Sequence, residues 1–145
     1  MAEQQENLAE VQYQCACGAC SVHAKGEALL SLYCHCDDCR TSAGSPSVAR
    51  ALFPKASVKV VSGETRTWTY KTNARTFCAT CGVILFSEPA SGHGLGLNAA
   101  LFPAGVFKPT MHVYCRFALA PVNDGLVHFS DVPKEYGGSG ETVDW

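Results

Sequence analysis

The segment Cys34–Arg40 reads CHCDDCR and is one of three short cysteine clusters in this chain of 145 residues. The other two are Cys15–Cys20, which reads CACGAC, and Phe77–Gly82, which reads FCATCG. Together they hold eight of the nine cysteines, in C-x-C and C-x-x-C spacings that are typical of metal ligands. One tetrahedral zinc ion takes four thiolates, so the chain has more cysteines than one site can use. The surplus predicts a second site, and a zinc site with an open position can do chemistry.

A disulfide framework is the alternative explanation for so many cysteines. Nine is an odd number, and cysteines two residues apart are badly placed to bridge one another. Residues 1–12 carry three glutamates, no lysine or arginine and no apolar run, so they resemble neither a signal peptide nor a transit peptide. We therefore expect a cytoplasmic or nuclear protein, in a reducing compartment where cysteine clusters bind metal.

The composition is that of one globular domain. Hydrophobic residues make up 47% of the chain and charged residues 17%, and the formal charge is −2 with no basic stripe. We therefore expect no nucleic-acid surface, and the longest apolar runs are too short to span a membrane. The expected organisation is a polar N-terminal tail at 1–12, one domain at 13–136 and a C-terminal tail at 137–145. The sequence leaves the oligomeric state open.

Glycine and proline divide the chain into short segments that are rich in β-branched and aromatic residues. Helical periodicity over ten or more residues is absent. The fold class is therefore all-β, with a short helical turn near residues 103–107. The expected strands are 19–25, 29–36, 47–53, 58–61, 65–70, 83–87, 95–98 and 111–117.

Strand geometry explains how the central cluster can share a metal ion. Residues i and i+2 of a strand point to the same face, so Cys34 and Cys36 point one way and His35 the other. Cys39 follows at knuckle spacing and adds a third thiolate. No fourth ligand is obvious nearby. Asp37 and Asp38, between Cys36 and Cys39, are possible ligands, but we expect both to be solvent-facing turn residues.

The Cys78/Cys81 knuckle ends in Gly82, which permits the left-handed backbone that such a turn often needs. Cys15 and Cys17 form a second pair that can complete a structural site, because structural zinc usually joins two remote segments and contributes folding free energy. Cys20 remains open: it can be a fourth ligand of the second zinc, a core residue, or an alternative ligand at the first site.

The ordered motifs C-x-C-G, C-H-C-x-x-C-R and F-C-x-x-C-G resemble those of the glutathione-dependent formaldehyde-activating enzyme family, which also contains centromere protein V. The resemblance runs from Tyr13 to Tyr136 and includes Ser42-Ala-Gly-Ser45 and Leu52-Phe-Pro54. It implies two packed antiparallel sheets with zinc sites at their margin. The chain departs from the family pattern at Cys20, at Ala99-Ala-Leu101 and at Phe117-Ala-Leu119.

The resemblance also implies two zinc ions per chain, with different roles. A structural zinc would bind Cys15, Cys17, Cys78 and Cys81. A functional zinc would bind Cys34, Cys36 and Cys39 and stay open to water or a substrate thiol.

The expected activity is that of a zinc-dependent carbon–sulfur lyase, in which the glutathione thiolate binds the open three-cysteine zinc. Arg40 and Arg75, with Lys71 behind them, are candidates to bind the carboxylates of glutathione, or else solvated surface charges. His35 is expected to be packed, and Cys115 to be a small buried hydrophobe. His112 could act as an acid–base group if its strand borders the pocket. The alternative function is a non-catalytic, zinc-stabilised interaction module similar to centromere protein V.

Overall fold

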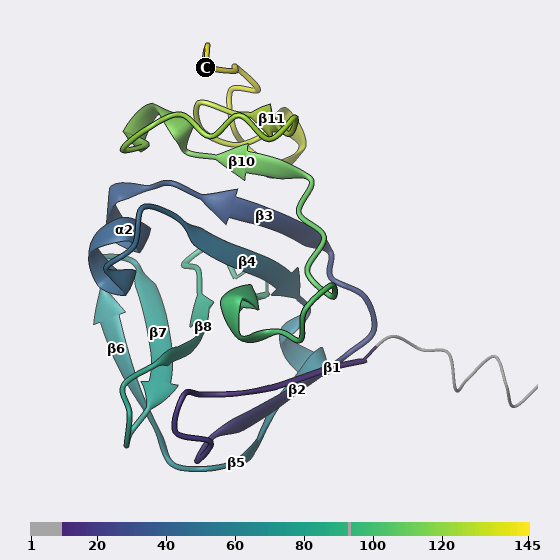
Figure 1. The fold of residues 1–145 in the computed structure, drawn as a ribbon, viewed down its shortest axis with the longest axis vertical. Coiled ribbons are helices and arrows are strands. Elements are labelled where there is room, and N and C mark those ends of the chain that lie inside the picture. Colours follow the sequence, from purple (N-terminus) through teal and green to yellow (C-terminus); the bar gives the residue numbers. More distant parts are fainter. Residues whose placement is uncertain (1–9, 93) are drawn as a thin grey trace, which may run out of the picture.

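The computed structural model describes residues 10–92 and 94–145, which form eleven strands in two sheets (Figure 1). The smaller sheet has the strand order β1-β2-β5, and the larger sheet has the order β11-β10-β3-β4-β9-β8-β7-β6. Within the described residues, no helix is long and apolar enough to cross a membrane. The strands are β1 (Glu10–Gln14), β2 (Ser21–Lys25), β3 (Leu30–Cys34), β4 (Val48–Phe53), β5 (Val58–Ser62), β6 (Thr65–Tyr70), β7 (Asn73–Cys78), β8 (Ile84–Glu88), β9 (Leu95–Asn98), β10 (Met111–Val113) and β11 (Val127–His128).

The short helical elements lie between these strands. The α-helix α2 follows β3, and Figure 1 shows it beside the turn that joins β6 to β7. The helical elements are α2 (Asp37–Ala43) and the 3-10 turns η1 (Lys55–Ser57), η2 (Ala99–Leu101), η3 (Cys115–Phe117) and η4 (Lys134–Tyr136). The all-β class with two sheets is therefore confirmed.

Most strand pairs are antiparallel, as expected, but one edge of the larger sheet is not. β10 pairs in parallel with both β3 and β11. Parallel neighbours need a long crossover connection, and here the chain between β3 and β10 forms most of the larger sheet. The larger sheet is therefore mixed and not purely antiparallel.

Side-chain alternation along β4 separates the two faces of the larger sheet. Ala51 and Phe53 pack with the residues of the smaller sheet in the main core. Arg50 and Leu52 alternate with them and line a cavity on the opposite face. Val48 shares that face and packs in a second apolar cluster with Cys34 and its neighbours. β4 is thus covered on both sides and contributes to both halves of the molecule.

Several boundaries differ from the sequence-based expectation. β1 begins at Glu10, so the last residues of the expected tail are part of a sheet, and 1–9 lie outside the described residues. The expected helical turn is a hydrogen-bonded turn in which the N–H of Val106 donates to Pro103 O, without helix. β10 stops at Val113 because Tyr114 adopts φ 55°, which breaks the strand.

The C-terminal residues also pack against the domain. Residue Trp145 lies against three histidines, with ring centroids 4.6 Å apart at His128 and 5.4 Å apart at His35. A backbone bridge joins Phe129 to Thr142. In the folded protein, residues 137–145 are therefore not a free tail.

Candidate metal centres

The first cluster joins the smaller sheet to the larger one through Cys15, Cys17, Cys78 and Cys81. Their four sulfur atoms all lie within 4.8 Å of one another, which is close enough to hold one metal ion. The Sγ of Cys17 lies 3.6 Å from the Sγ of Cys15 and 3.8 Å from that of Cys78. Four thiolates at about 2.3 Å from a central zinc would be about 3.8 Å apart, so this donor set fits tetrahedral zinc.

Two left-handed glycine turns shape the two halves of this cluster. Gly18 has φ 78° and Gly82 has φ 79°, which confirms the conformation expected for Gly82. The N–H of Cys81 donates to the sulfur of Cys78 at 3.4 Å. Such donors favour the thiolate, and this one is the main reason why the pKa of Cys78 is lowered.

Cys20 lies beside the first cluster without belonging to its four-sulfur group. Its side chain is fully buried, and its thiol donates to the carbonyl of Glu64 at 3.3 Å. Burial is the main cause that raises the pKa of Cys20 to about 11, so its side chain stays a protonated thiol. Cys20 packs in the main core and not in the cluster that contains Cys34 and Cys39. Of the roles left open by the sequence, the structure fits that of a core residue.

The second cluster consists of Cys34, Cys36 and Cys39, whose sulfurs also lie within 4.8 Å of one another. Cys34 ends β3, Cys36 is the N-cap of α2, and Cys39 lies one turn later. The Sγ of Cys36 accepts the N–H of Cys39 at 3.2 Å, so the helix turns the third thiol back toward the first two. Within the described residues, no histidine, carboxylate or further cysteine completes this group. The donor set suits zinc and leaves one tetrahedral position without a protein ligand.

The two aspartates after Cys36 start the helix and do not join the second cluster. Asp37 is exposed, and Asp38 forms an ion pair with Lys71 at 2.6 Å. Both lie in the first turn of α2, where acidic residues interact favourably with the helix dipole. The ion pair also connects α2 to the turn between β6 and β7.

The surroundings of the second cluster favour a thiolate at Cys39. Hydrogen bonds from the thiols of Cys34 and Cys36 are the main cause that lowers the pKa of Cys39, and the positive charges of Arg50 and Arg75 lower it further. Burial opposes this effect. Cationic side chains beside the cluster therefore offset the negative charge that three thiolates would concentrate here.

A cavity of about 220 Å³ adjoins the second cluster on the face of the larger sheet that turns away from the smaller sheet. Cys34 and Cys39 contribute to its wall. The other lining residues are Leu30, Leu32, Arg50, Leu52, Asn73, Ser87, Pro89, Gly96, Val113, Tyr114 and Val132. The cavity is therefore largely apolar with a few polar groups, which is the usual character of a small-molecule site.

The two arginines expected to contact glutathione, Arg40 and Arg75, are not among the residues that line this cavity. Arg75 is only 1% exposed, and its guanidinium donates to the carbonyls of Tyr70 and Asn73 at 3.4 and 3.1 Å. Arg50 lines the cavity in their place, and the sequence analysis missed it. A charged residue in the middle of a strand that is otherwise apolar was the available signal.

The two histidines nearest to the second cluster face away from the cavity. His35 and His112 are buried, and His35 Nε2 lies 2.9 Å from His112 Nδ1. His112 Nε2 lies 2.8 Å from Asp124 Oδ2. Burial lowers the pKa of His35 to about 4, and His112 lowers it further. His35 is therefore a packed, hydrogen-bonded histidine, as expected, and His112 does not border the cavity.

Cys115 also matches its expected role. It is buried in η3 and not in a strand, and burial raises its pKa to about 12. It therefore remains a thiol in the interior.

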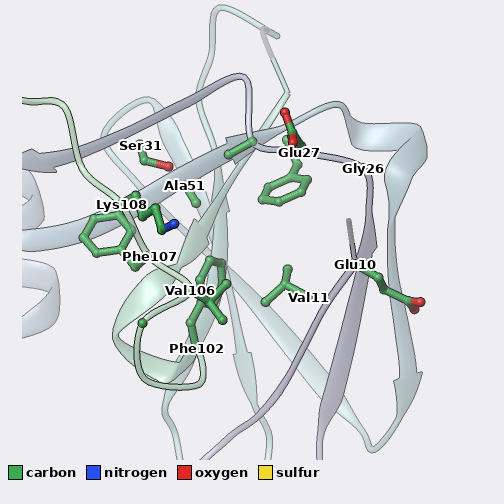
Figure 2. Close-up of a pocket in the computed structure, with 13 residues that line it drawn as sticks. Glu10, Val11, Gly26, Glu27, Ser31, Ala51, Phe102, Val106, Phe107 and Lys108 are labelled. Carbon is green, nitrogen blue, oxygen red and sulfur yellow. The ribbon is translucent and has the colours of Figure 1, made fainter. Parts of the chain in front are cut away.

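A larger cavity of about 410 Å³ lies on the opposite face of β3 and β4. Figure 2 shows it between the start of β1 and the segment 102–108, with the rings of Phe102 and Phe107 in its wall. Ser31 and Ala51 line this cavity, whereas their strand neighbours line the smaller one. Its wall contains no cysteine or histidine within the described part of the chain. The chemistry-bearing side chains therefore place the candidate site at the smaller cavity.

Comparisons with known proteins agree with this fold and these clusters. The family model described as glutathione-dependent formaldehyde-activating enzyme matches residues 10–117. A crystal structure of a Rhodobacter sphaeroides protein is 24% identical and covers 81% of this chain and 98% of its own, with a TM-score of 0.51. That likeness supports the fold. No curated protein matches the chain.

Proposed function

Because the chain belongs to the glutathione-dependent formaldehyde-activating enzyme family, we propose that it is a carbon–sulfur lyase that acts on glutathione adducts of small carbonyl compounds. The observation that carries this proposal is the second cluster, Cys34, Cys36 and Cys39. Within the described residues this cluster has no fourth protein ligand, and two of its members line a cavity. The thiol of glutathione is the ligand that we place at the open position.

The alternative is a non-catalytic module in which both metal sites are closed. Such a module would complete the second cluster with Cys20, Cys115 or an aspartate. Cys20 instead donates to a backbone carbonyl, and Asp38 pairs with Lys71. Cys115 is buried outside the three-sulfur group. These positions favour an open site and therefore an enzyme.

In this proposal the two clusters hold zinc for different purposes. Cys15, Cys17, Cys78 and Cys81 would hold a structural ion, and Cys34, Cys36 and Cys39 a functional one. When bound to the second cluster, zinc would keep a fourth ligand thiol deprotonated at neutral pH.

The protein's own residues would orient the reactants and limit the access of water. Five leucine and valine side chains line the cavity together with Cys34 and Cys39. The cavity is smaller than the about 300–1,000 Å³ of a site that encloses a drug-sized ligand. We therefore place the cysteinyl end of glutathione and its carbonyl partner inside, with the rest of the tripeptide outside.

The reaction needs no oxidant or reductant. The thiol of glutathione gives its proton to water as the thiolate forms. Its sulfur then bonds to the carbonyl carbon, the π electron pair moves to the carbonyl oxygen, and this oxygen takes a proton back from water. In the reverse direction the carbon–sulfur bond breaks and the carbonyl compound is released. Because the second cluster requires reduced thiols, and glutathione is the co-substrate, we place the protein in the cytoplasm or nucleus.

The test is to compare glutathione with S-methylglutathione by calorimetry on the zinc-loaded protein. The methylated peptide keeps every carboxylate and the amine but cannot present a thiolate. It should therefore bind far more weakly than glutathione. Cys36→Ser should remove this preference and the turnover of glutathione with formaldehyde, while Cys20→Ser should keep both. Equal affinity for the two peptides would mean that the protein holds glutathione elsewhere.

A further inference from the structure

The cavity beside the second cluster is lined by a cation, Arg50, whose guanidinium has no partner among the described residues. Arg50 is 9% exposed and is the one charged residue among the described residues that line the cavity. No hydrogen bond or ion pair reaches its guanidinium from residues 10–92 or 94–145. None of its nitrogens is among the fully buried atoms without a partner, so the guanidinium is open to the cavity. An anion in the cavity can therefore reach a cation that the described residues leave unpaired.

The strand register places Arg50 close to the second cluster. Val48 pairs with Cys34 across the sheet, and Arg50 pairs with Leu32. Residues two apart on a strand are about 6.6 Å apart and point to the same face. The side chain of Arg50 therefore lies on the same face of the sheet as that of Cys34, two residues along β4 from the position opposite Cys34.

A glycine and a serine shape the space around this arginine. A Cβ atom at Gly96 would lie 3.3 Å from the Cδ of Arg50 and 3.3 Å from the Oγ of Ser87. The absence of a side chain at Gly96 thus lets the arginine stem lie close against the sheet. Ser87 is 8% exposed and also lines the cavity, and its hydroxyl has no hydrogen-bond partner among the described residues. Two unpartnered polar groups therefore meet in a cavity with mainly apolar walls.

Arg75 is the other buried arginine among the described residues, and its arrangement differs. Its guanidinium donates to two backbone carbonyls, and Arg75 does not line the cavity. The planar donor fork of Arg50 stays free, and such a fork matches a carboxylate in bidentate fashion. The difference between the two arginines points to a ligand group.

We propose that Arg50, with Ser87 beside it, binds a carboxylate of the glutathione adduct next to the second cluster. This inference rests on the proposed function. The carboxylate has two sources: the carbonyl partner, which would then be a 2-oxo acid, or glutathione itself. With a 2-oxo acid, the sulfur bonds to the carbonyl carbon and the oxygen takes a proton from water, so the carboxylate stays one bond from the reacting carbon.

Two pairs of probes distinguish the sources in zinc-loaded protein. Mercaptoacetate and 2-mercaptoacetamide share a free thiol and differ in the carboxylate beside it. Glutathione and its glycine ethyl ester differ in the carboxylate of the peptide. Calorimetry on wild type and Arg50→Gln gives, for each pair, the affinity of the carboxylate probe divided by that of its partner without the carboxylate. Comparing this ratio between the two proteins removes the effect of any difference in thiol reactivity within a pair. Arg66→Gln, on the exposed strand β6, is the matched control.

In Arg50→Gln, the affinity for mercaptoacetate relative to 2-mercaptoacetamide is compared with the wild-type value. A fall of about ten-fold or more in this ratio would assign the subsite to the carbonyl partner. An equal fall in the glutathione ratio alone would assign it to the peptide. If neither ratio falls, the proposal is overturned. Should Arg50→Gln fail to fold or to bind zinc, Arg50→Lys keeps the charge but not the fork, and the same ratios decide.

These outcomes are separate from a failure of the proposed function. If wild type binds glutathione and S-methylglutathione equally, the thiol site itself is wrong, whatever the Arg50 ratios are. If wild type prefers glutathione and the Arg50 ratios stay unchanged, only the carboxylate subsite is wrong.

Discussion

Replacement of Cys78 by serine should destabilise the protein much more than replacement of Cys36. Cys78 is fully buried at the end of β7, and its sulfur lies 3.8 Å from that of Cys17, which is 61 residues away in the sequence. A metal that joins them closes a long loop in the unfolded chain. The chain-entropy relation used for disulfides gives about 4 kcal/mol at 25 °C for a loop of this length.

The second cluster closes a much shorter loop. Cys34 and Cys39 are five residues apart, and all three of its cysteines lie at the end of β3 and in the first turns of α2. The entropic free energy of closing a loop of n residues grows as 1.5RT ln n. The free energies of closing the two loops therefore differ by about 2 kcal/mol. The first cluster also joins two sheets, whereas the second holds one local segment.

The assay is urea-induced unfolding of each zinc-loaded variant, together with zinc analysis. Cys78→Ser should lose one zinc equivalent and at least about 4 kcal/mol of unfolding free energy. Cys36→Ser should weaken zinc at the other site and cost about 2 kcal/mol less. Cys20→Ser is the control, because Cys20 is equally buried but belongs to neither group. Equal losses for Cys78→Ser and Cys36→Ser would refute the division into structural and functional sites.

Two further predictions concern metal content and pH. Metal analysis of freshly purified, reduced protein should find close to two zinc equivalents per chain, because the cysteines form one group of four and one of three; a value near zero with paired cysteines would contradict this. Asp131 has a lowered pKa, mainly because its carboxylate accepts the backbone N–H of Ser139. Its stabilising effect is therefore complete above the ordinary pKa and is lost as the pH falls through the folded one. The gap in unfolding free energy between wild type and Asp131→Asn should be constant from pH 5 to 8 and shrink below about pH 4; a gap that is unchanged at pH 3 would contradict the assignment.

The two candidate metal-binding groups could be predicted from the sequence because the spacing within each cysteine pair is local. A C-x-C pair and a C-x-x-C knuckle fix their geometry within a few residues, and both predicted groups form in the structure. The all-β class followed from short β-branched segments between glycines and prolines. The spacing within each pair and the fold class depend little on which strands become neighbours, whereas the meeting of Cys15 and Cys17 with Cys78 and Cys81 depends on the tertiary structure.

The parts that could not be predicted depend on tertiary pairing. β7 reads NARTFC, whose polar residues gave no strand signal, yet Arg75 within it is buried. α2 has only seven residues, too few for a helical period to appear. Arg50 lines the cavity only because β4 is covered on both faces, and the sequence does not say which face adjoins the cysteines.

Under the proposed function, the separation of the two clusters would let one chain be both stable and open to a ligand. A metal that joins distant strands contributes to folding, so its coordination must stay closed. The second cluster lies in one local segment, and the surrounding sheet is already held by strand pairing to β4 and β10. Exchange of a fourth ligand there would therefore leave the fold intact. Under the proposal, the side chains beside it, such as Arg50, would then select the ligand, because strand pairing to β4 and β10 holds this part of the sheet.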